Sequence, residues 1–178
     1  MRQSHNLTKD ASLKNIAMKN QLTKIVNKLE KLPHWLCYLL LNYLLGLKVK
    51  FVGTAKVRCL HLSADKAVFK LANRRKVRNH IGTIHAAATA LVAETATGMA
   101  LAMHLPDDKL PLLKSMHIDY LSRTKGDLIA ESSLTAEQIE LLHTNEKGNL
   151  LIACRIIDDS RLEPVSCQME WAWTTRNR

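Results

Sequence analysis

Two stretches near the start of the chain carry apolar residues at helical spacing. In residues 12–32 they recur every three or four positions between lysines: Leu22, Ile25, Val26, Leu29 and Leu32. This pattern predicts an amphipathic helix that Pro33 ends, because proline cannot continue the backbone hydrogen bonding. A second, more apolar helix is expected from Trp35 to Leu44, with Gly46 as its stop.

From residue 56 onward the spacing of the apolar residues changes from that of a helix to that of β-strands. It predicts two strands at 57–62 and 67–71, and four more at 112–122, 127–134, 149–157 and 165–174. Residues 135–143 predict a short connecting helix.

Between the second and third predicted strands lies one long helix, residues 84–104. It contains eight alanines and one charged residue, Glu94. Alanine has a high helix propensity, and a surface helix would also present a charged face. The helix is therefore expected to be buried and central.

The order of these elements predicts the fold class. Short loops favour antiparallel neighbours among the strands. We expect an α+β protein in which an antiparallel sheet wraps around a long central helix, preceded by an N-terminal helical extension. The predicted division is residues 1–47 for the amphipathic helices and 48–178 for the sheet domain.

The positive charge is concentrated at the start of the chain. The net charge is +10, and residues 1–58 hold eleven Lys or Arg against Asp10 and Glu30. Such a segment favours an anionic partner. The two helices either dock on the core of their own domain or contact a membrane surface or a partner. Aromatic residues make up 4% of the chain, so base stacking is disfavoured and nucleic acid is an unlikely partner.

Neither the cysteines nor the histidines show metal-ligand spacing, so no metal and no cofactor is predicted. Four scattered cysteines are typical of a reducing, cytoplasmic compartment: Cys37, Cys59, Cys154 and Cys167. Residues 1–31 lack the apolar core of a signal peptide and are lysine-rich, unlike a typical transit peptide. The longest apolar stretch, 35–47, is too short to span a bilayer.

The residues that could carry chemistry lie before and on the central helix. A buried carboxylate is unfavourable without a partner, so Glu94 is either paired structurally or serves as a general base or nucleophile. Glu94 follows His85 by nine residues, which places the two on opposite sides of a helix and about 13 Å apart along it. They can share a site only across a two-fold dimer.

The start of the helix offers a second element. Backbone N–H groups at Ala86 and Ala87, together with the helix dipole, could stabilise negative charge on a carbonyl oxygen. A water activated by Glu94 would attack that carbonyl.

Asn79, Gly82, His85 and Glu94 together form a motif of the type Asn-x-x-Gly-x-x-His, with an acidic residue nine positions after the histidine. This motif resembles that of the hotdog-fold acyl-CoA thioesterases, in the branch similar to phenylacetyl-CoA thioesterase. Residues 116–131 also resemble the strand–turn–strand that follows the helix in that family. Over residues 50–175 the resemblance implies a hotdog fold, a homodimer or dimer of dimers, and hydrolysis of an acyl-CoA.

The resemblance also implies roles for individual residues. Glu94 would be the general base or nucleophile, supplied by the opposite subunit, and Asn79 would place the water or the thioester. The N–H of Ala86 would polarise the thioester carbonyl, while His85 orients the turn and Gly82 lies against the substrate. The family usually has His-Gly-Gly where this chain has His85-Ala86-Ala87, so the N–H can serve only if the turn needs no positive φ.

Basic residues close to the motif could bind the phosphates of coenzyme A, or simply form solvated loops. They lie in two predicted loops: Arg74, Arg75, Lys76 and Arg78 in one, Arg123 and Lys125 in the other.

Two alternatives keep the fold but change the function. The first is a hotdog protein that binds an acyl group or lipid without catalysis. The second is an acyl-thioester dehydratase, which uses a histidine and a glutamate fourteen residues apart, as are His80 and Glu94. The Pro-Gly expected between them in a dehydratase is absent.

Overall fold

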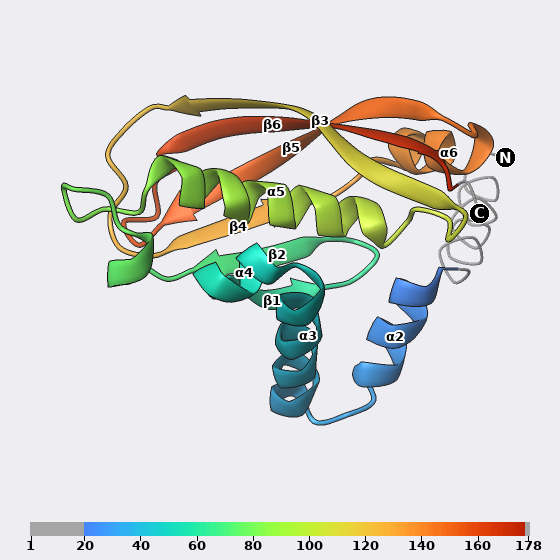
Figure 1. Cartoon of the computed structure of the whole chain (residues 1–178), viewed down its shortest axis with the longest axis horizontal. Helices are drawn as coiled ribbons and strands as arrows, with labels where there is room; N and C mark the ends of the chain where they lie inside the picture. The colour runs from blue at the N-terminus through green and yellow to red at the C-terminus, as the bar shows by residue number, and fades with distance from the viewer. Residues whose placement is uncertain (1–19, 177–178) are drawn as a thin grey trace, which may run out of the picture.

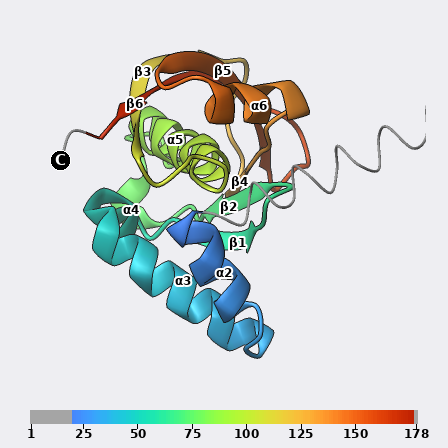
Figure 2. The same cartoon turned by 90° about the vertical axis from the view of Figure 1, so that its right-hand side faces the viewer.

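The structure is a computed structural model that describes residues 20–176. Helix α5 (Ala86–Ala102) lies along the concave side of an antiparallel sheet that curves around it (Figures 1 and 2). The six strands have the order β1-β2-β4-β5-β6-β3. Their bounds are β1 Arg58–Leu62, β2 Ala67–Leu71, β3 Lys109–Tyr120, β4 Leu128–Ser132, β5 Gly148–Asp158 and β6 Val165–Thr175. The predicted α+β class and the order of strands and helix are confirmed.

Helix α5 can be central because its side chains are small and the hydroxyls of its buried threonines are hydrogen-bonded. It packs against β2, β3, β4, β5 and β6. The hydroxyls of Thr95 and Thr97 donate to helix carbonyl oxygens one turn earlier, at 2.6 and 3.0 Å. Gly98 leaves room for the indole of Trp171, since a Cβ there would come within 2.8 Å of the ring. The sheet therefore closes tightly on the helix.

Two short elements complete the sheet domain. Helix α6 (Ala136–Thr144) follows β4, and Thr135 and Gln138 form a capping box at its start. The basic segment before α5, predicted as a loop, contains the 3-10 turn η1 (Arg75–Val77).

The N-terminal helices differ in detail from the prediction. Helix α2 (Gln21–Leu29) ends before Pro33, which instead caps α3 (His34–Lys48). The part of the predicted first helix before residue 20 lies outside the described residues. Helix α4 (Lys50–Ala55) was not predicted.

The expectation that Gly46 stops the second helix is wrong. Helix α3 continues past it to Lys48. Gly46 and Gly53 instead let α3 and α4 approach closely, because a Cβ on Gly46 would lie 3.3 Å from the Gly53 Cα and a Cβ on Gly53 would lie 2.9 Å from the Gly46 carbonyl oxygen. The glycine serves a helix contact rather than a helix end.

Polar side chains attach these helices to the sheet domain. Asn20 caps α2 and donates from Nδ2 to the Leu105 carbonyl oxygen at 2.8 Å, while the Thr23 hydroxyl donates to Met103 at 2.8 Å. Asn42 of α3 exchanges two hydrogen bonds with the backbone of Cys59 in β1. Buried side chains of α2 and α3 belong to the same core as those of the sheet. The division of the chain at residue 47 stays a prediction.

The two edges of the sheet differ. Asn42 satisfies backbone groups at the β1 edge. Strand β3 forms the other edge and, within residues 20–176, pairs only with β6. No helix in the same part of the chain is long and apolar enough to cross a membrane.

Candidate active site

The loop before α5 is organised by Asn79. Its Oδ1 accepts from the backbone N–H groups of Ile81 and Thr83, both at 3.1 Å, and its Nδ2 donates to the Thr83 hydroxyl at 2.8 Å. Gly82 has a φ of 80° with no neighbour within 4 Å of a built Cβ, so glycine is required there by conformation rather than by space. The amide of Asn79 thus shapes the turn that leads into the helix.

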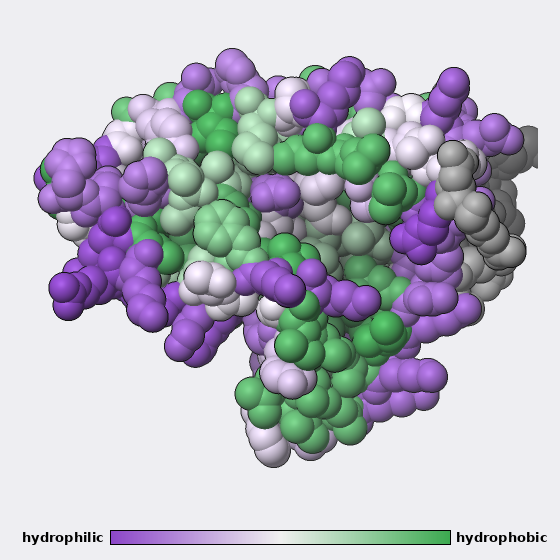
Figure 3. All heavy atoms as spheres, viewed as in Figure 1, coloured by the Kyte–Doolittle hydropathy of each residue, from purple (hydrophilic) through white to green (hydrophobic). Residues whose placement is uncertain are grey.

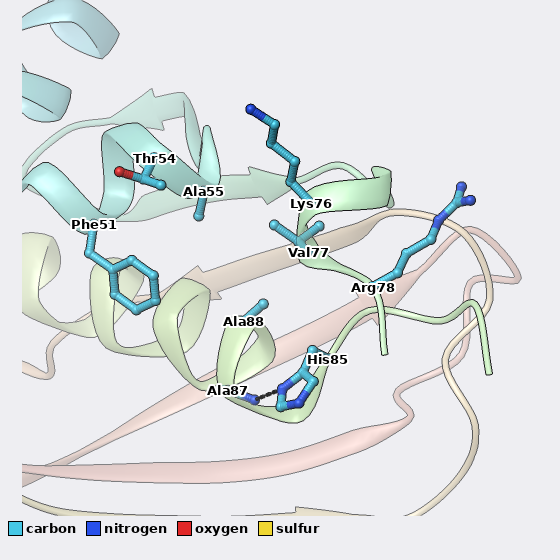
Figure 4. A pocket seen from close by; sticks show the side chains of 9 residues that line it. All are labelled: Phe51, Thr54, Ala55, Lys76, Val77, Arg78, His85, Ala87 and Ala88. Carbon is cyan, nitrogen blue, oxygen red and sulfur yellow. Dashed lines mark hydrogen bonds between the residues drawn. The ribbon is translucent and has the colours of Figure 1, made fainter. Parts of the chain in front are cut away.

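His85 caps the start of α5. Its backbone is extended (φ −65°, ψ 142°), and its Nδ1 accepts from the Ala87 N–H at 3.0 Å (Figure 4). The expectation that the Ala87 N–H is free is therefore wrong, because the imidazole ring of the capping residue itself occupies it.

The Ala86 N–H remains available. Among the described residues it has no acceptor, and Ala86 is exposed. Neither alanine has a positive φ, so the departure from His-Gly-Gly does not disturb the turn. A free N–H at the first position of a helix, where the dipole is positive, can stabilise an oxyanion.

Tyr120 was missed by sequence reasoning. Its hydroxyl, at the end of the edge strand β3, donates to the Ala86 carbonyl oxygen at 2.9 Å. Burial raises the pKa of the phenol, which keeps it a donor. A contact between residues 34 positions apart has no local pattern that could have revealed it.

A cavity of about 230 Å³ opens beside the helix start. Its walls come from α4, from η1 and from the first turn of α5 (Figure 4). They are lined by Phe51, Thr54, Ala55, Lys76, Val77, Arg78, His85, Ala87 and Ala88. The cavity combines an apolar wall with two cations, which suits an acyl group attached to an anionic carrier.

The six predicted phosphate-binding residues separate into two groups. Arg74 donates to Ala55, Arg78 to Asn73 and Arg123 to Ile81, each to a backbone carbonyl oxygen. These guanidinium groups hold the loops around the helix start. The other three have exposed side chains without a partner among residues 20–176: Arg75, Lys76 and Lys125.

A further basic cavity of about 480 Å³ was not predicted. It lies near the end of α4 and is lined by Lys56, Arg58, Leu60, Lys70, Ala72, Arg74 and Asp127. Asp127 is paired with Lys70 at 2.8 Å, and this hydrogen bond lowers the pKa of the carboxyl. Within residues 20–176, Lys56 and Arg58 have no ion-pair partner.

Glu94 lies in the middle of α5 and is half-buried, away from the hydrogen-bonded start of the helix. Its carboxylate has no hydrogen bond or ion pair within the described part of the chain. Burial raises the pKa of the carboxyl. A structural pairing with an arginine or a helix N-terminus, one of the two readings of this residue, is not found among residues 20–176.

Glu94 borders an apolar cavity of about 220 Å³. The other lining residues are Leu45, Val49, Val52, Thr95, Gly98, Met99, Ala102, Pro111 and Trp171. This cavity shares no residue with the one beside His85. A single chain therefore does not bring His85 and Glu94 into one cavity.

The remaining candidate chemistry finds little support in the geometry. His80, the histidine of the dehydratase alternative, is exposed and lines neither cavity. Across residues 20–176, no three His, Cys, Asp or Glu side chains are arranged to hold a metal ion.

The sequence matches a family model over residues 39–173, described as a domain of unknown function (DUF4442). A comparison with curated proteins gives no match.

Solved structures resemble this fold over most of their length. A protein from Pseudomonas aeruginosa, described as a probable thioesterase, is 22% identical with a TM-score of 0.70, covering 77% of this chain and 95% of that one. A thioesterase from Haemophilus influenzae is 11% identical with a TM-score of 0.60, covering 70% and 82%. A mutant thioesterase from Staphylococcus aureus is 19% identical with a TM-score of 0.58, covering 70% and 98%. These similarities confirm the predicted hotdog fold.

Proposed function

This chain belongs to the DUF4442 family, and from that premise and the geometry around α5 we propose that it is an acyl-CoA thioesterase. The observation that carries the proposal is the unpaired, half-buried carboxylate of Glu94 on an apolar cavity. An ionisable group kept in such a setting is a common feature of catalytic sites. The thioesterases among the structural neighbours support the same reaction class.

The reaction requires Glu94 and the Ala86 N–H to act on one carbonyl. Within one chain Glu94 lines one cavity, while His85 and Ala87, the neighbours of Ala86, line another, so we propose that Glu94 comes from the opposite subunit of a homodimer. The unpaired edge of β3 is the place for that subunit. Leu112, Met116 and Tyr120 on this strand are about half exposed and would become buried there.

In the proposed step, the carboxylate of Glu94 takes a proton from a water molecule as the water oxygen bonds to the thioester carbonyl carbon. The negative charge that develops on the carbonyl oxygen is stabilised by the Ala86 N–H. Collapse of this intermediate breaks the carbon–sulfur bond, and the departing thiolate takes up the proton from Glu94. The products are a free acid and coenzyme A.

The remaining residues position the substrate. His85 and Asn79 fix the turn that aims the Ala86 N–H, through the ring acceptor and the loop hydrogen bonds. Arg75, Lys76 and Lys125 are free to bind phosphates of coenzyme A, and Lys56 and Arg58 extend this basic surface.

The experiment is thiol release from a panel of acyl-CoAs, with the parent compared with Glu94→Gln. Glutamine keeps the shape but cannot accept the proton, so we expect a loss of about 10²- to 10⁴-fold in kcat. Glu140→Gln, an exposed glutamate of α6, is the matched control and should leave kcat unchanged. Equal activity of Glu94→Gln and parent would contradict the proposal. Acyl-CoA binding without turnover by the parent would replace it with the non-catalytic alternative.

A further inference from the structure

Helix α3 carries an unusual line of exposed apolar side chains. Trp35, Leu39, Tyr43 and Leu47 follow one another at intervals of four residues, and Phe51 of α4 continues the series. Residues four apart lie on one side of a helix. All five side chains are between 58% and 69% exposed. We call these five residues the apolar line.

The opposite side of α3 packs against the rest of the protein. Cys37 and Leu41 are buried against the body of the protein, and Asn42 is bonded to β1. A surface helix normally turns a polar face to solvent once its apolar face is buried. Helix α3 is apolar on both sides, so the apolar line needs a second partner.

The surroundings of the apolar line are strongly basic. Exposed lysines lie on α2 and at both ends of α3, while residues 20–58 contain a single acidic residue, Glu30. The lysines are Lys24, Lys28, Lys31, Lys48 and Lys50. In Figure 3 the projection formed by α3 is largely green, and purple side chains border it. An apolar strip with tryptophan and tyrosine, edged by lysines, is typical of helices that lie in a membrane interface.

Charge distinguishes this partner from a second copy of the chain. Two copies joined along the apolar line would bring their lysine borders together, which electrostatic repulsion opposes. An anionic bilayer offers the complementary charge, with phosphates for the lysines and acyl chains for the apolar side chains.

We propose that the apolar line and its lysines bind the surface of an anionic lipid bilayer. Helix α3, at 15 residues, lies in the interface and does not cross it. Phe51, at one end of the line, also lines the cavity beside His85, so the bilayer surface lies next to that cavity (Figure 4). The binding itself does not depend on the hydrolysis proposed above.

Vesicle sedimentation tests the proposal on the full chain. The parent is mixed with vesicles of phosphatidylcholine alone, or of equal parts phosphatidylcholine and phosphatidylglycerol. We expect binding to the anionic vesicles that is at least about tenfold tighter than to the neutral ones and that weakens with salt. No binding, or equal binding to both, would overturn the proposal.

Two variants locate the contact. Leu39→Gln with Leu47→Gln should weaken binding to anionic vesicles by at least about tenfold, since each leucine loses apolar burial. The matched control changes two exposed leucines of the sheet domain, Leu151→Gln with Leu162→Gln, and should bind as the parent does. Equal loss in both pairs would contradict a specific surface.

Light scattering distinguishes a second copy of the chain as the occupant. The parent and the Leu39→Gln, Leu47→Gln variant should have the same mass in solution. A lower mass for the variant would overturn the proposal, because the apolar line would then join two chains. Thiol release in vesicle-free buffer should be equal in both proteins, which separates this test from that of the proposed hydrolysis.

Discussion

The polar groups at the start of α5 and in its middle differ in their hydrogen bonding. At the start, Asn79, His85 and Tyr120 make hydrogen bonds that fix the loop and the first turn. In the middle, Glu94 is half-buried without any partner within residues 20–176. The first arrangement builds a rigid donor, and the second maintains a carboxylate that water or substrate must satisfy. The proposed reaction needs both, and the separation of the two cavities is the reason that we propose a dimer to supply them.

After Glu94→Gln, the largest expected effect comes from removing the Ala86 N–H, which has no acceptor among residues 20–176. Ala86→Pro deletes the N–H at the first position of α5, where proline is well tolerated, and the extended backbone of His85 suits a following proline. Loss of one such donor lowers kcat by about 10²- to 10³-fold. Thiol-release kinetics with the parent's best substrate measures it.

The control for Ala86→Pro is Ala136→Pro, which places proline at the first position of α6. Both variants should melt close to the parent, and only Ala86→Pro should lose activity. If both retain parent kcat, the Ala86 N–H has no role in the reaction.

A second, smaller effect concerns the cap of α5. His85→Ala removes the acceptor for the Ala87 N–H and should lower the free energy of unfolding by about 1 kcal/mol. His85→Asn restores a capping side chain and should recover most of that loss. Urea unfolding of both variants measures it. An unchanged free energy in His85→Ala would show that the ring does not hold the turn.

The basic residues should contribute a smaller effect still. Arg75→Gln with Lys76→Gln removes two exposed cations that have no partner among residues 20–176, and it should raise KM by about two- to threefold with little change in kcat. The effect should shrink at high salt because these charges are exposed. A fall in kcat at constant KM would place these residues in the chemistry rather than in binding.

The smallest effect is the stability penalty of Glu94. Burial raises the pKa of its carboxyl in the folded protein, so folding favours the protonated form. The penalty is absent below the unfolded pKa, grows as pH rises from there to the folded pKa, and is constant above it. Glu94→Gln should therefore melt above the parent at pH 7 and close to it near pH 4. Thermal melts at the two pH values decide this, and an equal difference at both would contradict a raised pKa.

Much of the fold was predictable because its pattern is local. The strand 67–71 and the alanine-rich helix were recognised from periodicity and composition, and both lie where expected. Helix α4 was missed, since Gly53 at its centre suggests no helix until its contact with Gly46 is seen. Such a contact depends on tertiary packing, which periodicity does not report.

The motif of the candidate site was predictable, but its hydrogen-bond network was not. Glu94 was singled out as the one charged residue of an apolar helix, whereas Asn79 and Gly82 were identified through the resemblance of the motif to that of the hotdog-fold thioesterases. Which donors stay free depends on bonds between distant residues, such as those of Arg123 to Ile81 and Tyr120 to Ala86. The bond from Ala87 to the His85 ring depends on a rotamer that the sequence does not specify.

The most direct test of the account is complementation between two inactive variants. Glu94→Gln and Ala86→Pro, carrying different affinity tags, are produced together, and the mixed dimer is isolated on both tags. If each site takes Glu94 from one subunit and the Ala86 N–H from the other, one of the two sites in the mixed dimer is intact. We predict about half of the parent's thiol-release rate per dimer. Activity no higher than that of the separate variants would contradict a shared site.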